Sequence, residues 1–305
     1  MALDTARTDG PRGWRLEEYA EKYRDTFKFE RRDGILQMQF HTRGGPAGQD
    51  GMHGNAGSSY DAWNHAWRDV GSDPENKVLI LTGTGEDWMR PPPMAEAVKR
   101  TAPRAGPRGA GTGRVYLDAV KNTENFIFGF NIPTIGVING PAPFHFATAL
   151  LCDITICADD TVLHESHCAL GTAPGDGASF VLQELLNLKQ AAYYLLLSEP
   201  IDAPTALRLG LVNEVLPRDK LLARAWEMAQ RIAALPPLGR LMSKQVIRRR
   251  WQQVHADHAA FEMAHEMLGA VIDAADGEAM TAPHWEGAEA VFEEARTQAR
   301  AKAGY

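Results

Sequence analysis

Three short, mostly apolar runs constrain the fold of this chain more than any other feature. They are KVLILT at 77–82, TIGVI at 134–138 and ITICA at 154–158. Runs of this length and composition are typical of strands that are buried on both faces, as in parallel sheets covered by helices. Because stretches with helical periodicity separate the runs, the sequence predicts an α/β fold.

Apolar periodicity and turn residues predict the remaining elements. We expect further strands at 27–30, 34–41 and 211–215, and helices at 58–70, 114–128, 178–186, 189–197, 203–209, 219–274 and 285–302. Ser58 precedes the first of these helices and suits an N-cap. The chain therefore divides into three regions, which are a charged N-terminal leader over 1–24, an α/β core over 25–230 and a helical C-terminal region over 231–305.

Composition excludes several classes of partner. The 305 residues are 44% hydrophobic and 23% charged, as in ordinary globular proteins. The 32 basic and 39 acidic residues give a net charge of −7, which argues against nucleic acid. The start lacks a secretory pattern, and polar residues and prolines interrupt the most apolar stretch, so no membrane partner is expected. Three cysteines without a CxxC pair favour a reducing, cytoplasmic location.

Four segments occur in an order and spacing that resemble the crotonase (enoyl-CoA hydratase/isomerase) superfamily. They are KVLILTGTG at 77–85, IPTIGVINGPA at 132–142, LLCDITICADD at 150–160 and LGTAPGDGASF at 170–180. The resemblance covers roughly residues 25–270. It implies a spiral of ββα units followed by helices, and an assembly into homo-trimers or dimers of trimers.

Two departures from the family pattern concern the chemistry of hydration. The two catalytic glutamates of the hydratases fall near Ala147 or Thr148 and at His167. The loop that helps to form the family's oxyanion hole reads WMRPPP at 88–93, and proline has no amide hydrogen to donate. Hydration of an enoyl thioester by the usual glutamate pair is therefore not expected.

One branch of the superfamily fits these departures better. The chain is similar to 6-oxocamphor hydrolase and related β-diketone hydrolases, which cleave a carbon–carbon bond between two ketones without coenzyme A. The matching positions are His145 after NGPxx, Asp153, His167 before a PGDG turn, and Glu266 within Ala-His-Glu. The resemblance implies a small-molecule ketone as substrate and no cofactor.

Such a cleavage needs an activated water, an electrophilic carbonyl and a group that holds the leaving enolate. A neutral imidazole is a natural base for the water, and a carboxylate on its other nitrogen fixes the tautomer. We expect His145 with Asp153 to form this pair, unless Asp153 has a structural role. His167 is expected to hold or protonate the enolate oxygen, its alternative being a neutral core histidine. Glu266 is the fourth catalytic candidate, and a solvated helical position is its alternative.

Five further residues are candidates for contact with the substrate. They are Trp88, Met89 and Arg90 in the early loop, Phe144 beside the histidine, and Asp176 in the PGDG turn. For Asp176, capping of the helix that follows is the more common role of an aspartate in such a turn. A metal site is not expected, because His164-Glu-Ser-His167 is not an HExxH motif and strand geometry would send the two histidines to opposite faces.

Two other functions remain open at this point. The first is an acyl-CoA hydratase, isomerase or thioesterase, whose phosphates the basic stretch 90–114 could attract; a solvated loop is the commoner explanation of such composition. The second is a non-catalytic binding protein on the same scaffold. The leading hypothesis is a cofactor-independent hydrolase that cleaves a β-diketone in a retro-Claisen reaction through an enolate.

Overall fold

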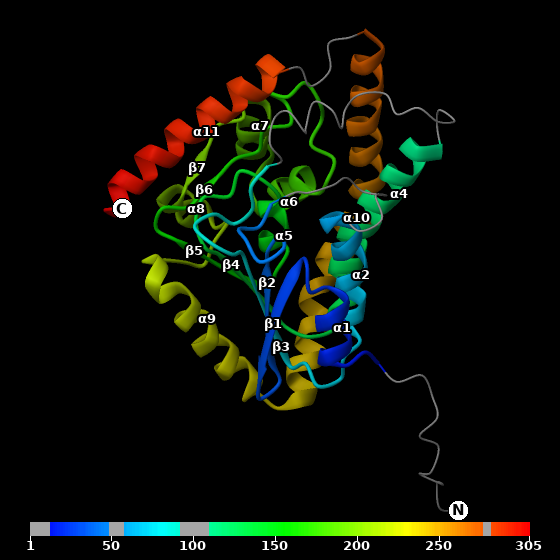
Figure 1. The fold of residues 1–305 in the computed structure, drawn as a ribbon, viewed down its shortest axis with the longest axis vertical. Coiled ribbons are helices and arrows are strands. Elements are labelled where there is room, and N and C mark those ends of the chain that lie inside the picture. Colours follow the sequence, from blue (N-terminus) through cyan, green and yellow to red (C-terminus); the bar gives the residue numbers. More distant parts are fainter. Residues whose placement is uncertain (1–12, 49–57, 92–109, 277–281) are drawn as a thin grey trace, which may run out of the picture.

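The computed structural model describes residues 13–48, 58–91, 110–276 and 282–305. Its centre is a six-stranded sheet with the order β1-β2-β3-β4-β5-β8 (Figure 1). Strands β1 (Phe27–Arg32) and β2 (Ile35–Phe40) are antiparallel. From β2 onwards each strand is parallel to the next one in the sheet, through β3 (Val78–Thr82), β4 (Thr134–Ile138), β5 (Ile154–Ala158) and β8 (Glu214–Leu216). Asp33 and Gly34 turn the hairpin with φ values of 53° and 83°, which suit a tight two-residue turn.

Apolar side chains cover both faces of this sheet. All five residues of β3 and all five of β4 are buried, which confirms the prediction from the apolar runs. On one face, Ile80 and Val137 pack with Leu221 and Ala225 of α9 (Arg218–Ala233). The larger cluster on the other face includes side chains of α2 (Ser59–Gly71), α4 (Ala110–Gly129) and α5 (Phe146–Leu150).

Helices dominate the chain after β5, as predicted. A small antiparallel pair, β6 (Val162–Leu163) with β7 (Ile201–Asp202), accompanies α6 (Ala178–Leu185), α7 (Leu188–Leu197) and α8 (Ala203–Leu209). The long α10 (Pro237–Asp276) packs against α4, and α11 (Ala282–Ala303) lies at the opposite side of the molecule (Figure 1). The mixed α/β architecture and the helical C-terminal region agree with what the resemblance implied.

Some element bounds differ from prediction. The helix expected over 219–274 is two helices, because the chain breaks before Pro237, where residues 234–236 are not helical. The strand expected at 211–215 lies at 214–216, since Gly210 ends α8 in a left-handed conformation and Leu211–Asn213 complete that turn. The described end of the predicted leader contains α1 (Leu16–Lys22), whose Tyr19 is fully buried and donates to Asp73.

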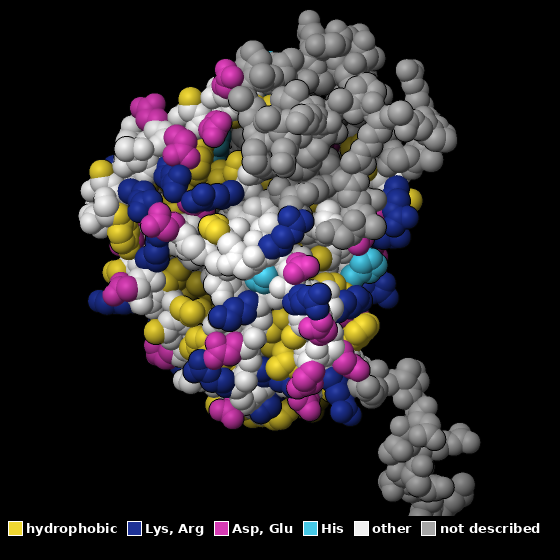
Figure 2. Space-filling view, in the orientation of Figure 1, with side chains coloured by type: hydrophobic (Ala, Val, Ile, Leu, Met, Phe, Trp, Pro, Cys, Tyr) yellow, Lys and Arg dark blue, Asp and Glu magenta, His cyan; other side chains and the backbone are white. Residues whose placement is uncertain are grey.

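Charged side chains of both signs are interspersed over the described part of the face in Figure 2. This face therefore presents no broad area of a single charge within the described residues. No helix in the described ranges is long and apolar enough to cross a membrane.

Candidate active site

His145 occupies a constrained position at the start of α5. Its backbone has a φ of 50°, a left-handed conformation that is uncommon outside glycine and often marks a functional site. The carbonyl of His145 accepts a hydrogen bond of 3.2 Å from the indole of Trp88. The ring meets the edges or faces of Tyr60, Trp63 and Phe144 at centroid distances of 5.1, 5.5 and 4.5 Å.

Both ring nitrogens of His145 have partners. Nδ1 lies 3.1 Å from Oδ2 of Asp176, and Nε2 forms a hydrogen bond with the hydroxyl of Tyr60. The expected imidazole–carboxylate pair is therefore present, but its acid is Asp176.

The predicted pairing of His145 with Asp153 is wrong. Asp153 instead accepts from Nζ of Lys244 at 2.8 Å and from the backbone amide of Thr134 at 2.8 Å, in a buried ion pair. The reason is topological: His145 follows the carboxyl end of β4, whereas Asp153 precedes the amino end of β5. Because β4 and β5 are parallel, these positions lie at opposite edges of the sheet, about 15 Å apart for five-residue strands.

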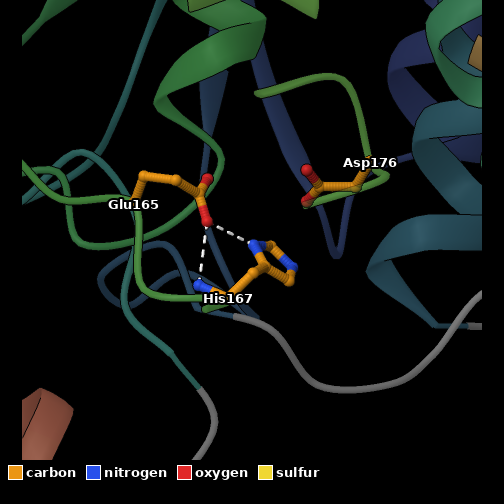
Figure 3. Close-up of side chains that lie close together, drawn as sticks. All are labelled: Glu165, His167 and Asp176. Carbon is orange, nitrogen blue, oxygen red and sulfur yellow. Dashed lines mark hydrogen bonds and ion pairs between the residues drawn. The ribbon is translucent and has the colours of Figure 1, made fainter. Parts of the chain in front are cut away.

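His167 lies between two carboxylates (Figure 3). Oε1 of Glu165 accepts from the amide of His167 at 2.9 Å and from its Nδ1 at 2.5 Å, and Asp176 lies on the other side of the ring. Burial by itself lowers the pKa of His167, but the negative charges of Glu165 and Asp176 and the bond to Glu165 raise that pKa well above its usual value. His167 is thus an imidazolium at neutral pH.

The PGDG turn and α10 bring two more acids to His167. Burial raises the pKa of Asp176, but the bond to His145 and the charge of His167 outweigh it and hold that pKa well below the usual range. Oε2 of Glu266 accepts from the amide of Gly175 at 2.9 Å. Burial raises the pKa of Glu266 to about 7, opposed by the charge of His167. Four of the predicted residues, His145, His167, Asp176 and Glu266, therefore form one electrostatic cluster.

A pocket opens beside this cluster between the start of α5, the segment after β6 and the start of α6. Two predicted histidines, Asp176 and Phe144 contribute to its wall. Its lining residues are Pro143, Phe144, His145, Phe146, Ala147, His164, Glu165, Ser166, His167, Asp176 and Ala178. His167, expected at the position of the second hydratase glutamate, lines this pocket, and so does Ala147, one of the two residues expected near the first. The arrangement thus offers a cation and several carboxylates in place of the usual acid pair.

The early loop supports the site from behind. Trp88 and Met89 are buried. The ring of Trp88 packs on Phe40 at a centroid distance of 5.4 Å, and its indole N–H donates to the carbonyl of His145. The amides of Trp88 and Arg90 donate to the carbonyls of Pro141 and Ala47, so neither is free to hold an oxyanion. Contact of these residues with substrate stays a prediction, and the parts of the predicted loops at 49–57 and 92–109 lie outside the described residues.

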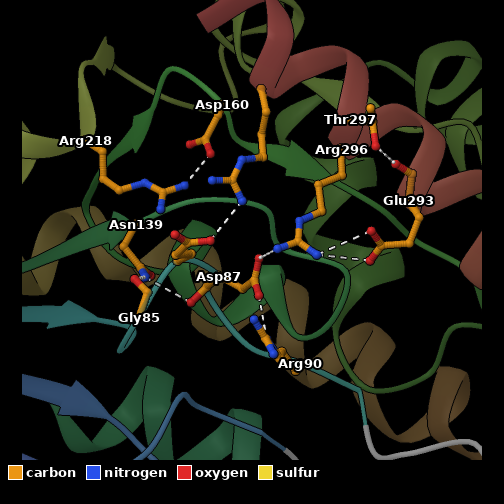
Figure 4. Close-up of polar contacts among 11 residues, drawn as sticks. Gly85, Asp87, Arg90, Asn139, Asp160, Arg218, Glu293, Arg296 and Thr297 are labelled. Carbon is orange, nitrogen blue, oxygen red and sulfur yellow. Dashed lines mark hydrogen bonds and ion pairs between the residues drawn. The ribbon is translucent and has the colours of Figure 1, made fainter. Parts of the chain in front are cut away.

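Helix α11 fixes this loop through ion pairs (Figure 4). The buried Asp87 accepts from Nε of Arg90 at 2.6 Å and lies 3.2 Å from Arg296 of α11. Asn139, at the end of β4, donates to the carbonyls of Gly85 and Asp87 at 3.0 and 2.9 Å. The segment that carries Trp88 is therefore tied both to the sheet and to the last helix.

Sequence reasoning missed Tyr60 and Glu165. Tyr60 lies in the predicted helix 58–70, and no local signal distinguishes a tyrosine whose hydroxyl meets a side chain 85 residues away. Glu165 was considered only as part of a metal motif. Its position two residues before His167 was the signal that a carboxylate could support this ring.

A divalent metal has three possible ligands here. Single ligand atoms of Glu165, His167 and Asp176 lie within 4.8 Å of one another. The sequence did not indicate such a set, because the third ligand comes from the PGDG turn and not from the His-Glu-Ser-His motif. Metal binding would require His167 to lose its proton, against the effect of the surrounding carboxylates.

Comparison with known proteins assigns the fold to a family. The chain belongs to the enoyl-CoA hydratase/isomerase family, whose profile matches residues 60–296. Carnitinyl-CoA dehydratase of Citrobacter koseri is 33% identical over 58% of this chain and 65% of its own length. Hydroxycinnamoyl-CoA hydratase-lyase of Pseudomonas fluorescens is 28% identical over 54% and 59%. The chain thus spans about three fifths of the length of these curated relatives.

Solved structures extend the comparison over more of the chain. A beta-diketone hydrolase from the cyanobacterium Anabaena sp. PCC 7120, bound to (S)-3-oxocyclohexyl acetic acid, is similar with a TM-score of 0.74 and 28% identity over 86% of this chain and 98% of that one. An enoyl-CoA hydratase/isomerase from Mycobacterium paratuberculosis has a TM-score of 0.70 at 19% identity over 81% and 94%, a likeness of fold alone.

Proposed function

We propose that this protein is a cofactor-independent hydrolase that cleaves the carbon–carbon bond between the carbonyls of a β-diketone. The observation that carries the proposal is the replacement of the hydration machinery in the pocket. His167 lines the pocket at the position of the second glutamate, Ala147 lines it at one of the two positions where the first could fall, and the carboxylates around His167 raise its pKa. The similarity to a beta-diketone hydrolase over 98% of that chain supports the same reaction class.

The reaction needs a base whose pKa lies near the working pH. Glu266, with a pKa of about 7, meets this requirement, whereas Asp176 is too weak a base and His167 carries a proton already. We assign to Glu266 the removal of a proton from water. The hydroxide equivalent then adds to one carbonyl carbon.

The remaining steps follow from the charge of His167. The imidazolium stabilises the oxyanion of the tetrahedral intermediate and the negative charge that moves to the second carbonyl oxygen. The bond between the attacked carbon and the central carbon breaks, and its electron pair forms the enolate. Glu266 returns the water's proton to the enolate carbon, so the products are one carboxylic acid and one ketone.

The expectation that His145 itself is the base stays a prediction. Both of its nitrogens have partners in this structure, Asp176 and Tyr60, and this favours Glu266 for the role. In the proposed mechanism His145 donates to Asp176 and keeps that carboxylate in the pocket wall.

A substrate screen tests the proposal. Cyclic and open-chain β-diketones are incubated with the protein, and loss of enol absorbance is followed for wild type, Glu266→Gln and His145→Ala. We expect turnover by wild type and a loss of kcat of about a hundredfold in Glu266→Gln, the usual contribution of general base catalysis. Glu227→Gln, an exposed carboxylate on α9, is the matched control.

The outcomes separate the assignments. If kcat falls sharply in His145→Ala and stays normal in Glu266→Gln, the general base is His145 and not Glu266. Absence of turnover by wild type across a broad panel of diketones would contradict the proposed function as a whole.

A second candidate is an enzyme that acts on coenzyme A thioesters. The observation that favours it is the identity of the curated relatives, both of which are named for coenzyme A substrates. A specific ligand of the native state raises the melting temperature, so acyl-coenzyme A should raise it if this candidate is right. A shift with a diketone and none with coenzyme A favours the hydrolase, and stabilisation by neither supports a non-catalytic binding role.

A further inference from the structure

The side chain of Glu262 is buried where α10 meets the start of α6, and the proposed mechanism does not use it. It lies one turn before Glu266 on α10, and its side chain is only 8% exposed. Oε2 of Glu262 accepts a hydrogen bond of 3.2 Å from the amide of Phe180, and Oε1 lies 3.4 Å from Nε2 of Gln183. A buried carboxyl group needs such partners, because burial without them is costly.

Helix α6 begins without a capping side chain of its own. Its N-cap is Gly177, whose φ of 112° suits glycine and which has no side chain to accept from the first amides of the helix. Phe180 is the third residue of α6, and its amide is one that an N-cap serine or aspartate normally binds. Glu262 therefore supplies from α10 the cap that α6 lacks.

Two glutamates of α10 hold the two ends of the segment 175–180. The amide of Gly175 donates to Oε2 of Glu266 at 2.9 Å, and the amide of Phe180 donates to Glu262. The two glutamates are four residues apart, so they project from the same face of the helix. Asp176, which lines the pocket, lies between the two bound amides.

One of these contacts alone would leave the segment free to rotate. Gly175 and Gly177 stand on either side of Asp176, and glycine restricts the backbone less than any other residue. A bond at Gly175 fixes the chain only before Asp176. The bond from Phe180 to Glu262 fixes it again after the second glycine.

We propose that Glu262 is a positioning residue, which holds the start of α6 on α10 and so keeps Asp176 in the pocket wall. The hydrogen bonds to Glu262 and Glu266 act as a unit, because the loss of one lets the segment move away from the other. For its effect on turnover, this inference rests on the proposed function.

Hydrogen exchange of single amides, followed by NMR, tests the proposal without substrate. In Glu262→Ala we expect the amide of Phe180 to exchange about tenfold faster, because its acceptor is gone. The amide of Gly175 should also exchange several-fold faster, although its own acceptor, Glu266, is unchanged. A rise at Phe180 alone would show that the two contacts are independent and would overturn the inference, as would no rise at either amide.

Kinetics on the best diketone distinguish positioning from simple stabilisation of the fold. In Glu262→Ala we expect kcat to be about tenfold lower with KM nearly unchanged, because a displaced group near the reacting atoms weakens the transition state and not substrate binding. Glu262→Gln keeps an oxygen that can accept from Phe180 and should restore kcat to within about threefold of wild type. Equal losses in the two variants contradict the proposal. If Glu262→Ala does not fold, Glu262→Asp replaces it, since its shorter side chain withdraws the carboxylate from Phe180.

Asp202→Ala is the matched control. The carboxylate of Asp202 accepts from the amide of Thr205 at 3.1 Å, so this change also removes a cap from the first turn of a helix, here α8. Asp202 is not among the residues that line the pocket. We expect a lower melting temperature, with kcat and the exchange of Gly175 and Phe180 equal to wild type. A tenfold loss of kcat in this control would show that any weakened helix start lowers turnover, against a specific role of Glu262.

The combined outcomes separate this inference from the proposed function. Faster exchange at both amides with a lower kcat supports both. Faster exchange at both amides in Glu262→Ala, when wild type turns over no diketone, supports the role of Glu262 in holding the segment and contradicts the proposed function alone. Faster exchange with an unchanged kcat contradicts the positioning role.

Discussion

At the residue scale, the pocket is governed by charges that burial brings together. Three carboxylates surround one imidazolium, and their protonation differs because their partners differ. Asp176 is ionised beside two histidines, whereas burial raises the pKa of Glu266 to about 7. Carboxyl groups whose environments push their pKa values apart can act separately as charge and as base.

Activity should therefore follow the ionisation of Glu266. We expect kcat/KM to rise with pH through about 7, as the carboxyl becomes a base, and to fall at higher pH as His167 loses its proton. A pH–rate profile on the best diketone measures both limbs. A profile that is flat between about pH 6 and 8 would contradict the assignment of Glu266.

These pKa shifts also make the stability of the fold depend on pH. His167 and Glu266 change it in one direction and Asp176 in the other. The pKa of His167 is raised on folding, so its contribution to stability is full below about pH 6.5 and is lost as pH rises through the folded pKa. The raised pKa of Glu266 means that ionisation opposes folding, so stability also falls as pH rises from about 4.5 to about 7. Asp176 acts in the other direction: its contribution is present above about pH 4 and is lost in acid.

Asp153 should matter for stability and not for chemistry. Asp153→Asn leaves Lys244 as a buried charge without its partner, and loss of one member of a buried pair costs about 3–5 kcal/mol. Urea denaturation measures this loss, and turnover per folded molecule should stay within a few-fold of wild type. The ion pair of Arg224 with Glu227, whose carboxylate is exposed, is the control, since Glu227→Gln should change stability very little. A stable but inactive Asp153→Asn would restore a catalytic role for Asp153.

At the element scale, the position of α10 decides whether Glu266 reaches the PGDG turn and the charge of His167. The PGDG turn approaches this helix so closely that a Cβ on Gly175 would lie 2.6 Å from the carbonyl oxygen of Glu262 and 2.8 Å from Cβ of Glu266. Only glycine allows this approach, and the amide of Gly175 then donates to the Glu266 carboxylate.

Gly175→Ala should push α10 away from the turn. We expect kcat to fall at least tenfold with a melting temperature several degrees lower, because backbone and not a flexible side chain must move. Gly239→Ala, on the same helix with open space around it, is the matched control and should be neutral or slightly stabilising. Full activity in Gly175→Ala would show that the close approach is not needed.

Local patterns predicted the elements well where packing agrees with periodicity. The strands at 134–138 and 154–158 have the predicted bounds, because buried β-branched runs have few other stable conformations. The break before Pro237 was not predicted, since apolar spacing continues on both sides of it. The local sequence does not indicate which elements contact each other, so the approach of α10 to the PGDG turn could not be predicted.

At the scale of the whole molecule, the last helix holds a loop near the middle of the chain. Arg296 of α11 pairs with Asp87 (Figure 4). Arg300 pairs with Glu86, and both acids belong to the segment that also carries Trp88. The end of the chain thus stabilises the support beneath His145.

Arg296→Met should weaken this support. Asp87 is nearly fully buried and would keep only Arg90, so we expect a loss of about 3 kcal/mol in unfolding free energy. Arg300→Met, whose partner Glu86 is more than half exposed, is the control and should change the unfolding free energy very little. Chemical denaturation compares the two, and equal losses would contradict a special role for Asp87.

Assembly is a further proposal at this scale. Leu188, Leu196 and Leu197 of α7 are 70%, 71% and 60% exposed in the single chain. Such exposed apolar side chains favour contact with a partner. We expect sedimentation to show homo-trimers or dimers of trimers, and Leu196→Glu to shift the distribution toward smaller species. A monomer at all concentrations would contradict this proposal.

The sequence by itself determined the α/β class, most element bounds and the types of residue in the pocket, because apolar periodicity is a local consequence of which face is buried. Only the tertiary structure decided which side chains meet. Asp153 pairs with Lys244, 91 residues away, and Tyr60 with His145, 85 residues away. Two parallel strands send residues that are close in sequence to opposite edges of the sheet. Contacts of this kind depend on the path of the whole chain, and spacing along the sequence carries no record of it.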